Sequence, residues 1–225
     1  MKTAPMIFQQ QAYEYIKTNI LNLKLKPGQY IMDTQIAGEL NISRTPVREA
    51  FHRIENEGLL VYEQRKGWKV YTLTLKDVHE IFDLKEMIES NIAFKAANCK
   101  DEFLRDELKQ IISQMAEVSK TNDSAGWFET DQRLHETLFK MADNQRAYAI
   151  FINLNEQWHR LRIGFTVIQG RMDRSIAEHQ VVVDNVLAGN AEEASRLTRL
   201  HLMNLRTELV NVLVNLVLPF AGNGI

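Results

Sequence analysis

The segment at residues 41–60, NISRTPVREAFHRIENEGLL, constrains the fold more than any other part of the chain. Four apolar residues recur in it at the spacing of one helix face: Val47, Ala50, Phe51 and Ile54. Ser43 is a good N-cap, Pro46 falls in a first turn where proline is tolerated, and Gly58 is typical of the position just beyond a helix end. The pattern predicts a helix over residues 43–57 with one buried face.

The opposite face of this predicted helix is basic and polar. Its side chains are those of Arg44, Thr45, Arg48 and His52. A helix that enters the major groove of DNA has this division, because an apolar back holds it on its own domain while hydrogen-bond donors on its front meet base edges and phosphates. The alternative is a solvated basic face, which is common for any single helix.

The residues on either side predict a small winged domain. Apolar residues at helical spacing indicate a first helix over residues 8–23, which a Pro-Gly pair ends. A short helix follows from about residue 33, with Asp33 or Thr34 as its cap. Beyond the third helix, aromatic and β-branched residues flank a basic tip at residues 65–67 and predict a hairpin. This order of elements is that of a winged helix-turn-helix.

From about residue 76 the sequence shows only long helical patterns separated by short breaks. Six helices are predicted, over residues 76–98, 103–121, 125–142, 144–168, 172–188 and 191–218. Helices joined by short loops are typical of an antiparallel bundle. The predicted fold is therefore mainly α, with an N-terminal winged helix-turn-helix domain at residues 1–75 and a C-terminal all-α six-helix antiparallel bundle at residues 76–225.

Composition and charge indicate where the protein works and what it binds. The one cysteine, Cys99, excludes an internal disulfide, which fits the cytoplasm. The first residues lack the apolar stretch of a secretion signal and no apolar run reaches the length of a membrane span, so no membrane partner is predicted. The net charge is −2, divided into +3 over residues 1–72 and −5 over residues 73–225. This modest asymmetry favours an anionic partner for the N-terminal domain.

Four residues of the helical region have the chemistry of metal ligands. Asp131 and His135 are four residues apart, so they lie on one face of a helix, and His179 and His201 fall on later predicted helices. Imidazole suits zinc, nickel, cobalt or iron, and the carboxylate adds charge. A pair with this spacing also arises by chance, and a lone histidine is more often a surface or hydrogen-bonded residue.

At this point the chain resembles a known family. The string PGQYIMDTQIAGELNISRTPVREAFHRIENEGLL, followed by RKGWKV, is similar to the DNA-binding domain of the GntR family of bacterial transcription regulators. The SRTPVREA portion is the most specific, and the likeness runs through residues 8–72. The helical region resembles the C-terminal effector domain, called FCD, of the FadR-type subfamily. Its six predicted helices look closer to the shorter, VanR-like branch.

The resemblance implies a homodimer that binds a palindromic operator in double-stranded DNA. Arg44 and Arg48 would reach guanine edges or adjacent phosphates, Thr45 would contact the backbone, and the hairpin tip would enter the minor groove. Thr34 stands where some relatives carry a DNA-contacting arginine, so the operator sequence cannot be transferred from them. The full set of implied DNA-binding residues is Ser43, Arg44, Thr45, Arg48, His52, Arg65, Lys66 and Gly67.

The resemblance also supports a divalent metal ion held by Asp131, His135, His179 and His201. Zinc is the first expectation, and nickel and manganese stay open. The metal would anchor a small-molecule effector, a carboxylate by family expectation. The expected effector-binding residues are Lys85, Trp158, Arg162 and Asn204, although Arg162 could instead pair with a surface acid and Trp158 could belong to the core or a dimer interface. Lys85 stands where relatives often have arginine.

These patterns predict a ligand-responsive bacterial transcription regulator, a repressor, and not an enzyme. The alternative is a metal-dependent hydrolase or lyase with an accessory helical domain, since the same four ligands could activate water. No carboxylate is spaced as an obvious general base, however, and the sequence has no nucleophile motif, phosphate loop or dinucleotide fingerprint.

Overall fold

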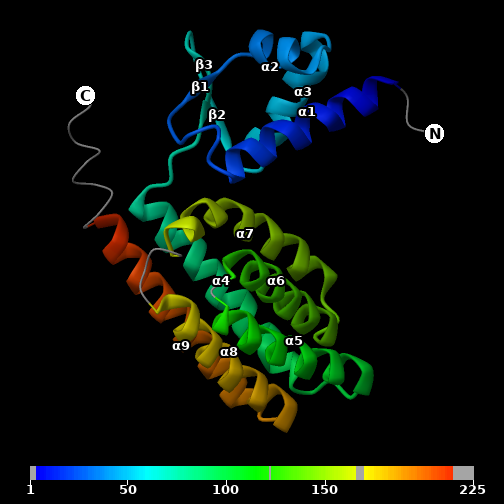
Figure 1. Ribbon diagram of the computed structural model, residues 1–225, viewed down its shortest axis with the longest axis vertical. Coiled ribbons are helices and arrows are strands. Elements are labelled where there is room, and N and C mark those ends of the chain that lie inside the picture. Colours follow the sequence, from blue (N-terminus) through cyan, green and yellow to red (C-terminus); the bar gives the residue numbers. More distant parts are fainter. Residues whose placement is uncertain (1–3, 122, 166–169, 215–225) are drawn as a thin grey trace. The chain divides into compact units, whose positions relative to one another are not determined.

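The computed structural model describes residues 4–121, 123–165 and 170–214, apart from the side chains of residues 4, 5, 119, 124, 158–165 and 212. This part of the chain forms nine helices and three short strands (Figure 1). It divides into two compact units. The first comprises Met1–Thr74 with Asn155–Arg160, and the second comprises Leu75–Leu154 with Leu161–Ile225.

The first unit is a winged helix-turn-helix, as the sequence predicts. Its elements in chain order are α1 (Ala4–Leu21), β1 (Tyr30–Ile31), α2 (Asp33–Leu40), α3 (Arg44–Asn56), β2 (Leu60–Glu63) and β3 (Gly67–Val70). The predicted hairpin is β2 and β3, paired antiparallel with Glu63 opposite Gly67. The third strand was not predicted: β1 is only two residues long and forms by pairing with β3, where Ile31 lies opposite Trp68.

The core of the first unit is apolar and holds the back of α3. The four residues of the predicted buried face are each 0% exposed: Val47, Ala50, Phe51 and Ile54. They pack in one cluster with apolar residues of α1, α2 and the sheet. Truncating a buried phenylalanine such as Phe51 typically costs about 3–5 kcal/mol, so this cluster fixes α3 firmly.

The ends of the helices in the helix-turn-helix follow local sequence signals, with one correction. Asn41 ends α2 in the left-handed conformation, with φ of 53°, and Gly58 follows the end of α3 with φ of 74°. The expected cap of α2 was wrong, because Met32 occupies the N-cap position and makes no side-chain capping bond. Asp33 is instead the first residue of α2, and its carboxylate is engaged with arginines of α3.

The second unit is all-helical in its described residues, which confirms the predicted class. Its helices are α4 (Leu75–Ala96), α5 (Glu102–Lys120), α6 (Ser124–Met141), α7 (Gln145–Phe165, except for the part that groups with the first unit), α8 (Arg171–Ala188) and α9 (Ala191–Val212). The helix pairs α4 with α9, α5 with α6, and α8 with α9 lie side by side (Figure 1). The predicted end of the last helix, at residue 218, lies outside the described residues.

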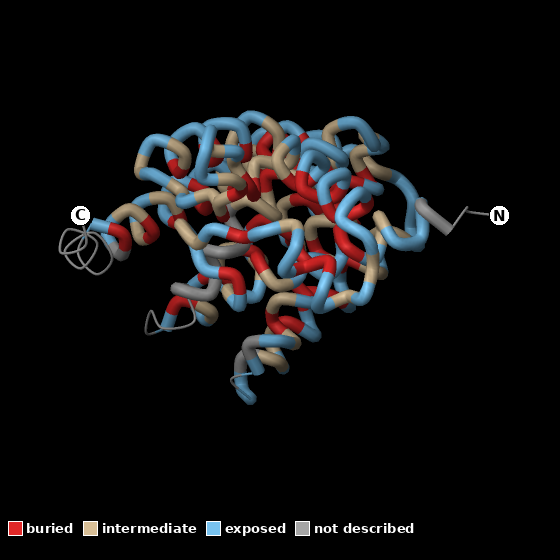
Figure 2. Tube along the Cα trace, turned by 90° about the horizontal axis from the view of Figure 1, so that it is seen from above, coloured by how far each residue is buried: buried red, intermediate tan, exposed pale blue. Residues whose placement is uncertain are grey.

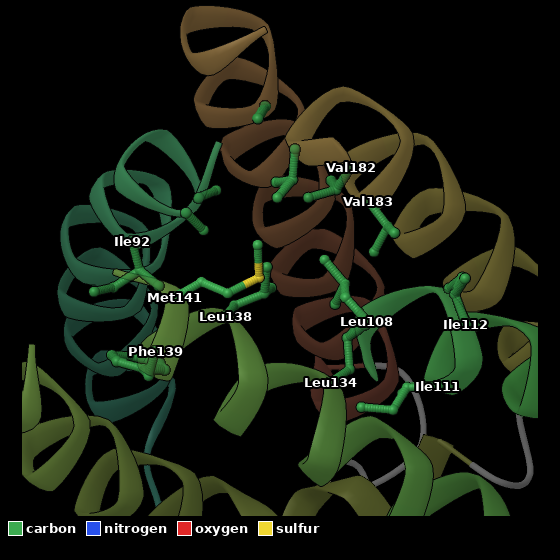
Figure 3. Close-up of a cluster of buried hydrophobic side chains, with 14 of the residues drawn as sticks. Ile92, Leu108, Ile111, Ile112, Leu134, Leu138, Phe139, Met141, Val182 and Val183 are labelled. Atoms are coloured by element: carbon green, nitrogen blue, oxygen red, sulfur yellow. The ribbon is translucent and has the colours of Figure 1, made fainter. Parts of the chain in front are cut away.

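Buried side chains of all six helices contribute to the core of this unit. Figure 3 shows Ile92 of α4, Leu108 of α5, Leu134 and Phe139 of α6, and Val183 of α8 pointing toward one another. Along each helix, buried and exposed stretches alternate, as an amphipathic helix requires (Figure 2). Polar residues also enter this interior: Lys85, Glu89, Ser90, Thr130, Asp131, Thr137, Arg171, Ser175, His179, Thr198 and His201 are all buried.

Candidate DNA-binding face and metal site

The front of α3 is open to solvent, in contrast to its back. The side chains of Arg44, Arg48 and His52 are 54%, 58% and 68% exposed. Five of the eight residues expected to contact DNA line one surface hollow between the start of α2, α3 and the hairpin: Arg44, Arg48, His52, Lys66 and Gly67. The other three, Ser43, Thr45 and Arg65, are exposed but do not line the hollow.

The hairpin tip has a conformation that needs glycine. Arg65 and Gly67 both have positive φ, of 70° and 94°. The amide of Lys66 donates to the carbonyl of Glu63 at 3.1 Å, which closes the turn. A side chain at position 67 would strain the backbone, since L-residues rarely adopt such a φ. The tip therefore presents two basic side chains on a turn of fixed shape.

One carboxylate ties the hairpin together. Glu63 accepts hydrogen bonds from the Tyr30 hydroxyl and from Lys69 at 2.9 Å, and Lys66 lies 3.4 Å away. The Tyr30 hydrogen bond and then the Lys69 ammonium lower the pKa of Glu63 to about 2. The charged carboxylate thus links β1 to the wing.

Trp68 connects the wing to α3. Its ring is 8% exposed and lies 5.3 Å from the Phe51 ring, 4.9 Å from the His52 ring and 5.2 Å from the Tyr62 ring, measured between centroids. Aromatic pairs at these separations are favourable beyond their buried area. Trp68 therefore fixes where the wing stands relative to the exposed face of α3. Nothing in the sequence pattern marked Trp68 for this role.

Asp33 is the second residue of this face that sequence reasoning missed. Its Oδ2 accepts from Arg44 Nη2 at 3.1 Å and from Arg48 Nε. Partial burial acts to raise the pKa of Asp33, but the two arginines outweigh it and lower that pKa. An acidic residue in a first helical turn was visible in the sequence, but its distance from the arginines of the next helix was not.

In the second unit, three of the four expected metal ligands form a tight group. Asp131 and His135 lie one turn apart on α6 and His179 comes from α8, with one ligand atom of each within 4.8 Å of the others. His135 Nε2 and His179 Nδ1 lie 3.8 and 3.7 Å from Asp131 Oδ1. Ligand atoms around a tetrahedral zinc stand about 3.4 Å apart. Small side-chain shifts would bring the three residues onto one ion.

The fourth expected ligand, His201, borders the same space. Its ring centroid lies 4.5 Å from that of His179. A cavity of about 20 Å³ is lined by His135, His179, His201 and Glu89, together with apolar side chains of α4, α6 and α8. That volume holds a body the size of one water molecule or ion. Asp131 does not line this cavity, so the structure places the four predicted ligands in two overlapping groups that share His135 and His179.

Two of these histidines are oriented by buried ion pairs. His135 Nδ1 lies 3.3 Å from Glu89, whose other oxygen lies 2.7 Å from Lys85 Nζ. On the far side, His201 Nδ1 donates to Glu178 at 2.7 Å, and Arg171 Nη2 donates to the same carboxylate at 3.1 Å. In both cases the carboxylate is next to Nδ1 of the imidazole, which leaves Nε2 as the nitrogen that could bind a metal ion.

The electrostatics of Glu178 show how firmly this arrangement is held. Burial acts to raise the pKa of Glu178, but the hydrogen bond from His201, followed by Asn204 and Arg171, lowers it to about 2. The carboxylate is therefore charged at neutral pH, and His201 is held against it. Sequence reasoning missed Glu89 and Arg171, since nothing in their spacing marks them as partners of these histidines.

His179 differs from the other two histidines. Both of its ring nitrogens are buried, and neither has a hydrogen-bond partner among the described residues. Burial, and then the neighbouring His201, lowers the pKa of His179 well below its ordinary value. Burial also lowers the pKa of His135. A neutral imidazole with an unshared electron pair is the form that binds metal, so the residues present fit a divalent ion.

The four residues expected to bind an effector lie in different surroundings, and two of them fall outside the described side chains. Lys85 is 2% exposed, bound to Glu89, and lies over the Phe151 ring at 4.7 Å. Asn204 is exposed and donates to Glu178 at 2.9 Å, the carboxylate that also binds His201. The side chains of Trp158 and Arg162 lie outside the described residues. Lys85 and Asn204 thus contact the carboxylates that hold the histidines.

Among the described residues, none of the helices combines the length and the apolar character that a membrane span requires.

Comparison with known proteins finds a matching family model for each of the two units. The family model described as bacterial regulatory proteins, gntR family, matches residues 8–70, and that of the FCD domain matches residues 80–204. The uncharacterized HTH-type transcriptional regulator YdhC of Bacillus subtilis is 28% identical over 201 residues, 88% of each chain. The HTH-type transcriptional repressor RspR of Escherichia coli is 28% identical over 153 residues, 68% of this chain and 67% of its own.

A solved structure shares the fold. E. coli McbR/YncC superposes with a TM-score of 0.74 over 94% of this chain and 99% of its own, at 15% identity. The relatives with these two domains are transcriptional regulators and not enzymes, so the hydrolase alternative has no support. The chain belongs to the GntR family of bacterial regulatory proteins, carries an FCD domain, and is a transcriptional regulator.

Proposed function

We propose that the protein is a ligand-responsive repressor that binds a palindromic operator as a homodimer. Residues 1–75 would bind DNA and residues 76–225 would bind metal and effector and form the dimer. The observation that carries the proposal is the division of α3 into a fully buried apolar back and an exposed face with two arginines. Repression is favoured by the likeness to a relative named as a repressor. A repressor of bacterial genes works in the cytoplasm, where the DNA lies.

The DNA-binding part can be tested without knowing the operator. Arg44 and Arg48 are placed on one exposed helix face and would read base edges, while Lys66 would contact phosphate from the wing. The test is selection of bound duplexes from a random library, followed by sequencing. We expect a short inverted repeat with two half-sites, because a dimer with twofold symmetry presents two copies of α3. Enrichment of no sequence would refute the proposal.

Homodimerisation is supported by an exposed apolar surface on α4 and α9, which pack side by side. The surface consists of Leu84, Met87, Phe94, Leu200 and Met203, with exposed fractions of 44%, 66%, 38%, 44% and 48%. A hollow between the two helices is lined by Glu86 and Arg199 among others. A twofold axis across this surface would bury the same apolar residues on both copies.

The test of this surface is the oligomeric state of the double variant Met87→Glu/Met203→Glu. Sedimentation should show a monomer, because two buried carboxylates per copy would oppose the apolar contact. The matched control is Phe103→Glu on α5, which is 77% exposed and lies off the surface. A double variant that stays dimeric would place the dimer interface elsewhere.

Inside the second unit we infer a zinc ion held by Asp131, His135, His179 and His201. The unpartnered, buried nitrogens of His179 carry this inference. When bound, the ion would supply a Lewis-acidic anchor for the carboxylate of a small organic acid. Metal analysis of purified protein should find about one equivalent of zinc per chain, a single-site stoichiometry. Nickel or manganese in its place would correct the identity of the ion, whereas failure to bind any divalent metal would refute the site.

Effector binding must also change DNA affinity. A small carboxylate can do so only if it binds one arrangement of the dimer more tightly than the other. The cavity of about 20 Å³ is too small for such an acid, so helices around it must shift to admit one. The test compares the affinity of zinc-loaded protein for the selected duplex with and without a panel of small carboxylates. Binding of a carboxylate that leaves this affinity unchanged would make the metal site purely structural.

A further inference from the structure

A single carboxylate controls both arginines on the front of α3. Asp33, at the start of α2, accepts from Arg44 and Arg48 through the same oxygen. The Asp33 side chain is only 14% exposed, whereas those of Arg44 and Arg48 are 54% and 58% exposed. Within the described lining of the hollow that these residues share with the wing, Asp33 is the one acidic residue. Its position is therefore central to the basic surface.

Neither helix capping nor fold stability accounts for an acid at this position. Asp33 does not cap α2, because the N-cap is Met32 and no side-chain capping bond forms. Asp33 lies in the first turn of α2, where a carboxylate favours the helix dipole, and its pairs with two mostly exposed arginines are screened by solvent, so both contributions to folding stability are small. The contact therefore does more for the arginines than for the fold.

The geometry leaves the end of the Arg48 guanidinium able to bind DNA, whereas Arg44 is held through one of its terminal amino groups, Nη2. Arg48 is held through Nε, and its two terminal amino groups make no other hydrogen bond within the described residues. A guanidinium carries five N–H groups in a rigid fork, so a grip on Nε leaves the end that forms paired bonds with guanine. Ordering a free arginine side chain costs conformational entropy, and Asp33 removes part of that cost before DNA arrives.

The same carboxylate opposes binding to any duplex. It faces the surface that would meet phosphates, and one negative charge there offsets part of the attraction of Arg44, Arg48 and Lys66. Specific binding regains this loss through base contacts from positioned arginines, whereas non-specific binding does not.

We propose that Asp33 is a specificity-determining residue, which positions Arg44 and Arg48 for base contacts and weakens binding to non-operator DNA. The inference rests on the proposed DNA-binding function. It concerns the ratio of two affinities rather than the affinity for operator alone, and this makes it separable from the proposed function itself.

The experiment uses the full-length Asp33→Asn variant, which keeps the shape of the side chain and removes its charge. Affinities for a duplex selected by the wild-type protein and for a scrambled duplex of the same composition are measured at several salt concentrations. We expect the variant to bind the scrambled duplex more tightly and to discriminate about 10-fold less, the lower part of the range for one well-placed arginine contact. Asp33→Ser serves as a second variant, should the first fail to fold.

A matched control separates position from net charge. Glu39 lies on the same helix, is exposed, and hydrogen-bonds to Tyr15 away from the hollow. Glu39→Gln removes the same charge and should leave the discrimination ratio unchanged. If Asp33→Asn also leaves that ratio unchanged, or shifts both affinities equally, the inference about Asp33 is wrong while the proposed function stands. If the wild-type protein discriminates between no duplexes, the proposed function fails first.

Discussion

The two units place their charged groups in opposite ways. In the described part of the first unit the buried core is entirely apolar, and the arginines, lysines and Asp33 lie around it. All the buried polar residues of the described chain belong to the second unit, where they fall between Lys85 and His201 in the sequence. The candidate site of the first unit thus lies on the surface, outside the apolar core, whereas the candidate site of the second unit is part of the core.

This difference determines how freely each site can change. A substitution on the exposed face of α3 removes no packing, so binding and stability should separate. A substitution in the buried cluster leaves a partner unpaired, and removing one member of a buried ion pair costs about 3–5 kcal/mol. In the second unit, metal affinity and stability should therefore change together, except where a side chain has no partner to lose.

His179 is that exception. His179→Leu should therefore separate metal affinity from stability, and it has the largest expected effect of the variants considered. Zinc affinity should fall by more than about 100-fold, beyond the loss of an outer partner, because a ligand is removed. The metal-free protein should become more stable by about 1–3 kcal/mol, since two unpaired buried nitrogens are replaced by carbon. Calorimetric titration with zinc and urea unfolding in chelator measure the two quantities.

The control for His179→Leu is His79→Leu, an exposed histidine on α4. That change should alter neither zinc affinity nor stability. A metal-free His179→Leu protein that is less stable than the wild type would mean that His179 contributes to the core as packed, and that the unpaired nitrogens carry no cost.

Arg48→Ala is the corresponding test in the first unit. Affinity for the selected duplex should fall by about 1–3 kcal/mol, from roughly 5-fold to 150-fold, through loss of a base contact. The unfolding midpoint should not change, because the side chain is 58% exposed and its removal opens no cavity. Arg53→Ala, on the same helix but bonded to Gln10 of α1, is the matched control and should bind DNA normally. Unchanged duplex affinity in Arg48→Ala would refute the assignment of α3.

The sequence predicted those features of the first unit that are set by residues close together in the chain. The apolar face of α3, the left-handed residues Asn41 and Gly58, and the turn of the wing all depend on a few adjacent residues. The strand β1 could not be found in this way, because two residues form it only by pairing with β3. The role of Asp33 likewise depends on how α2 and α3 cross, which no spacing encodes.

In the second unit, residue type was more informative than position. Asp131, His135, His179 and His201 were singled out because few side chains bind metal; the fold groups the first three closely, and the three histidines line one cavity. Their partners were not found, because lysine, arginine and glutamate are ordinary surface residues in a sequence. Lys85 illustrates this: it was expected to contact an effector, and the structure adds a contact that the sequence does not show, with its ammonium 2.7 Å from Glu89.

Glu178→Gln tests whether such a partner acts through the histidine that it holds. Zinc affinity should fall by about 10-fold, at the lower end for loss of an outer partner, because a neutral amide holds His201 less firmly. Stability should also fall, because Arg171 loses a charged partner in the interior. Glu192→Gln, exposed at the start of α9, is the control. Reduced stability with unchanged zinc affinity would leave Glu178 as a partner of Arg171 alone.

Lys66→Ala on the wing should have the smallest effect on DNA affinity, and it tests whether the wing of the first unit contacts phosphates or bases. Its ammonium is 68% exposed and only 3.4 Å from Glu63, so its removal should not destabilise the fold. If it contacts a phosphate, all duplexes should bind more weakly by a similar factor, and the slope of log affinity against log salt should fall by about 1. Lys76→Ala, exposed and paired with Glu80 on α4, is the control. A loss confined to the selected duplex would show that the wing reads bases, and that sequence recognition in this unit is not limited to α3.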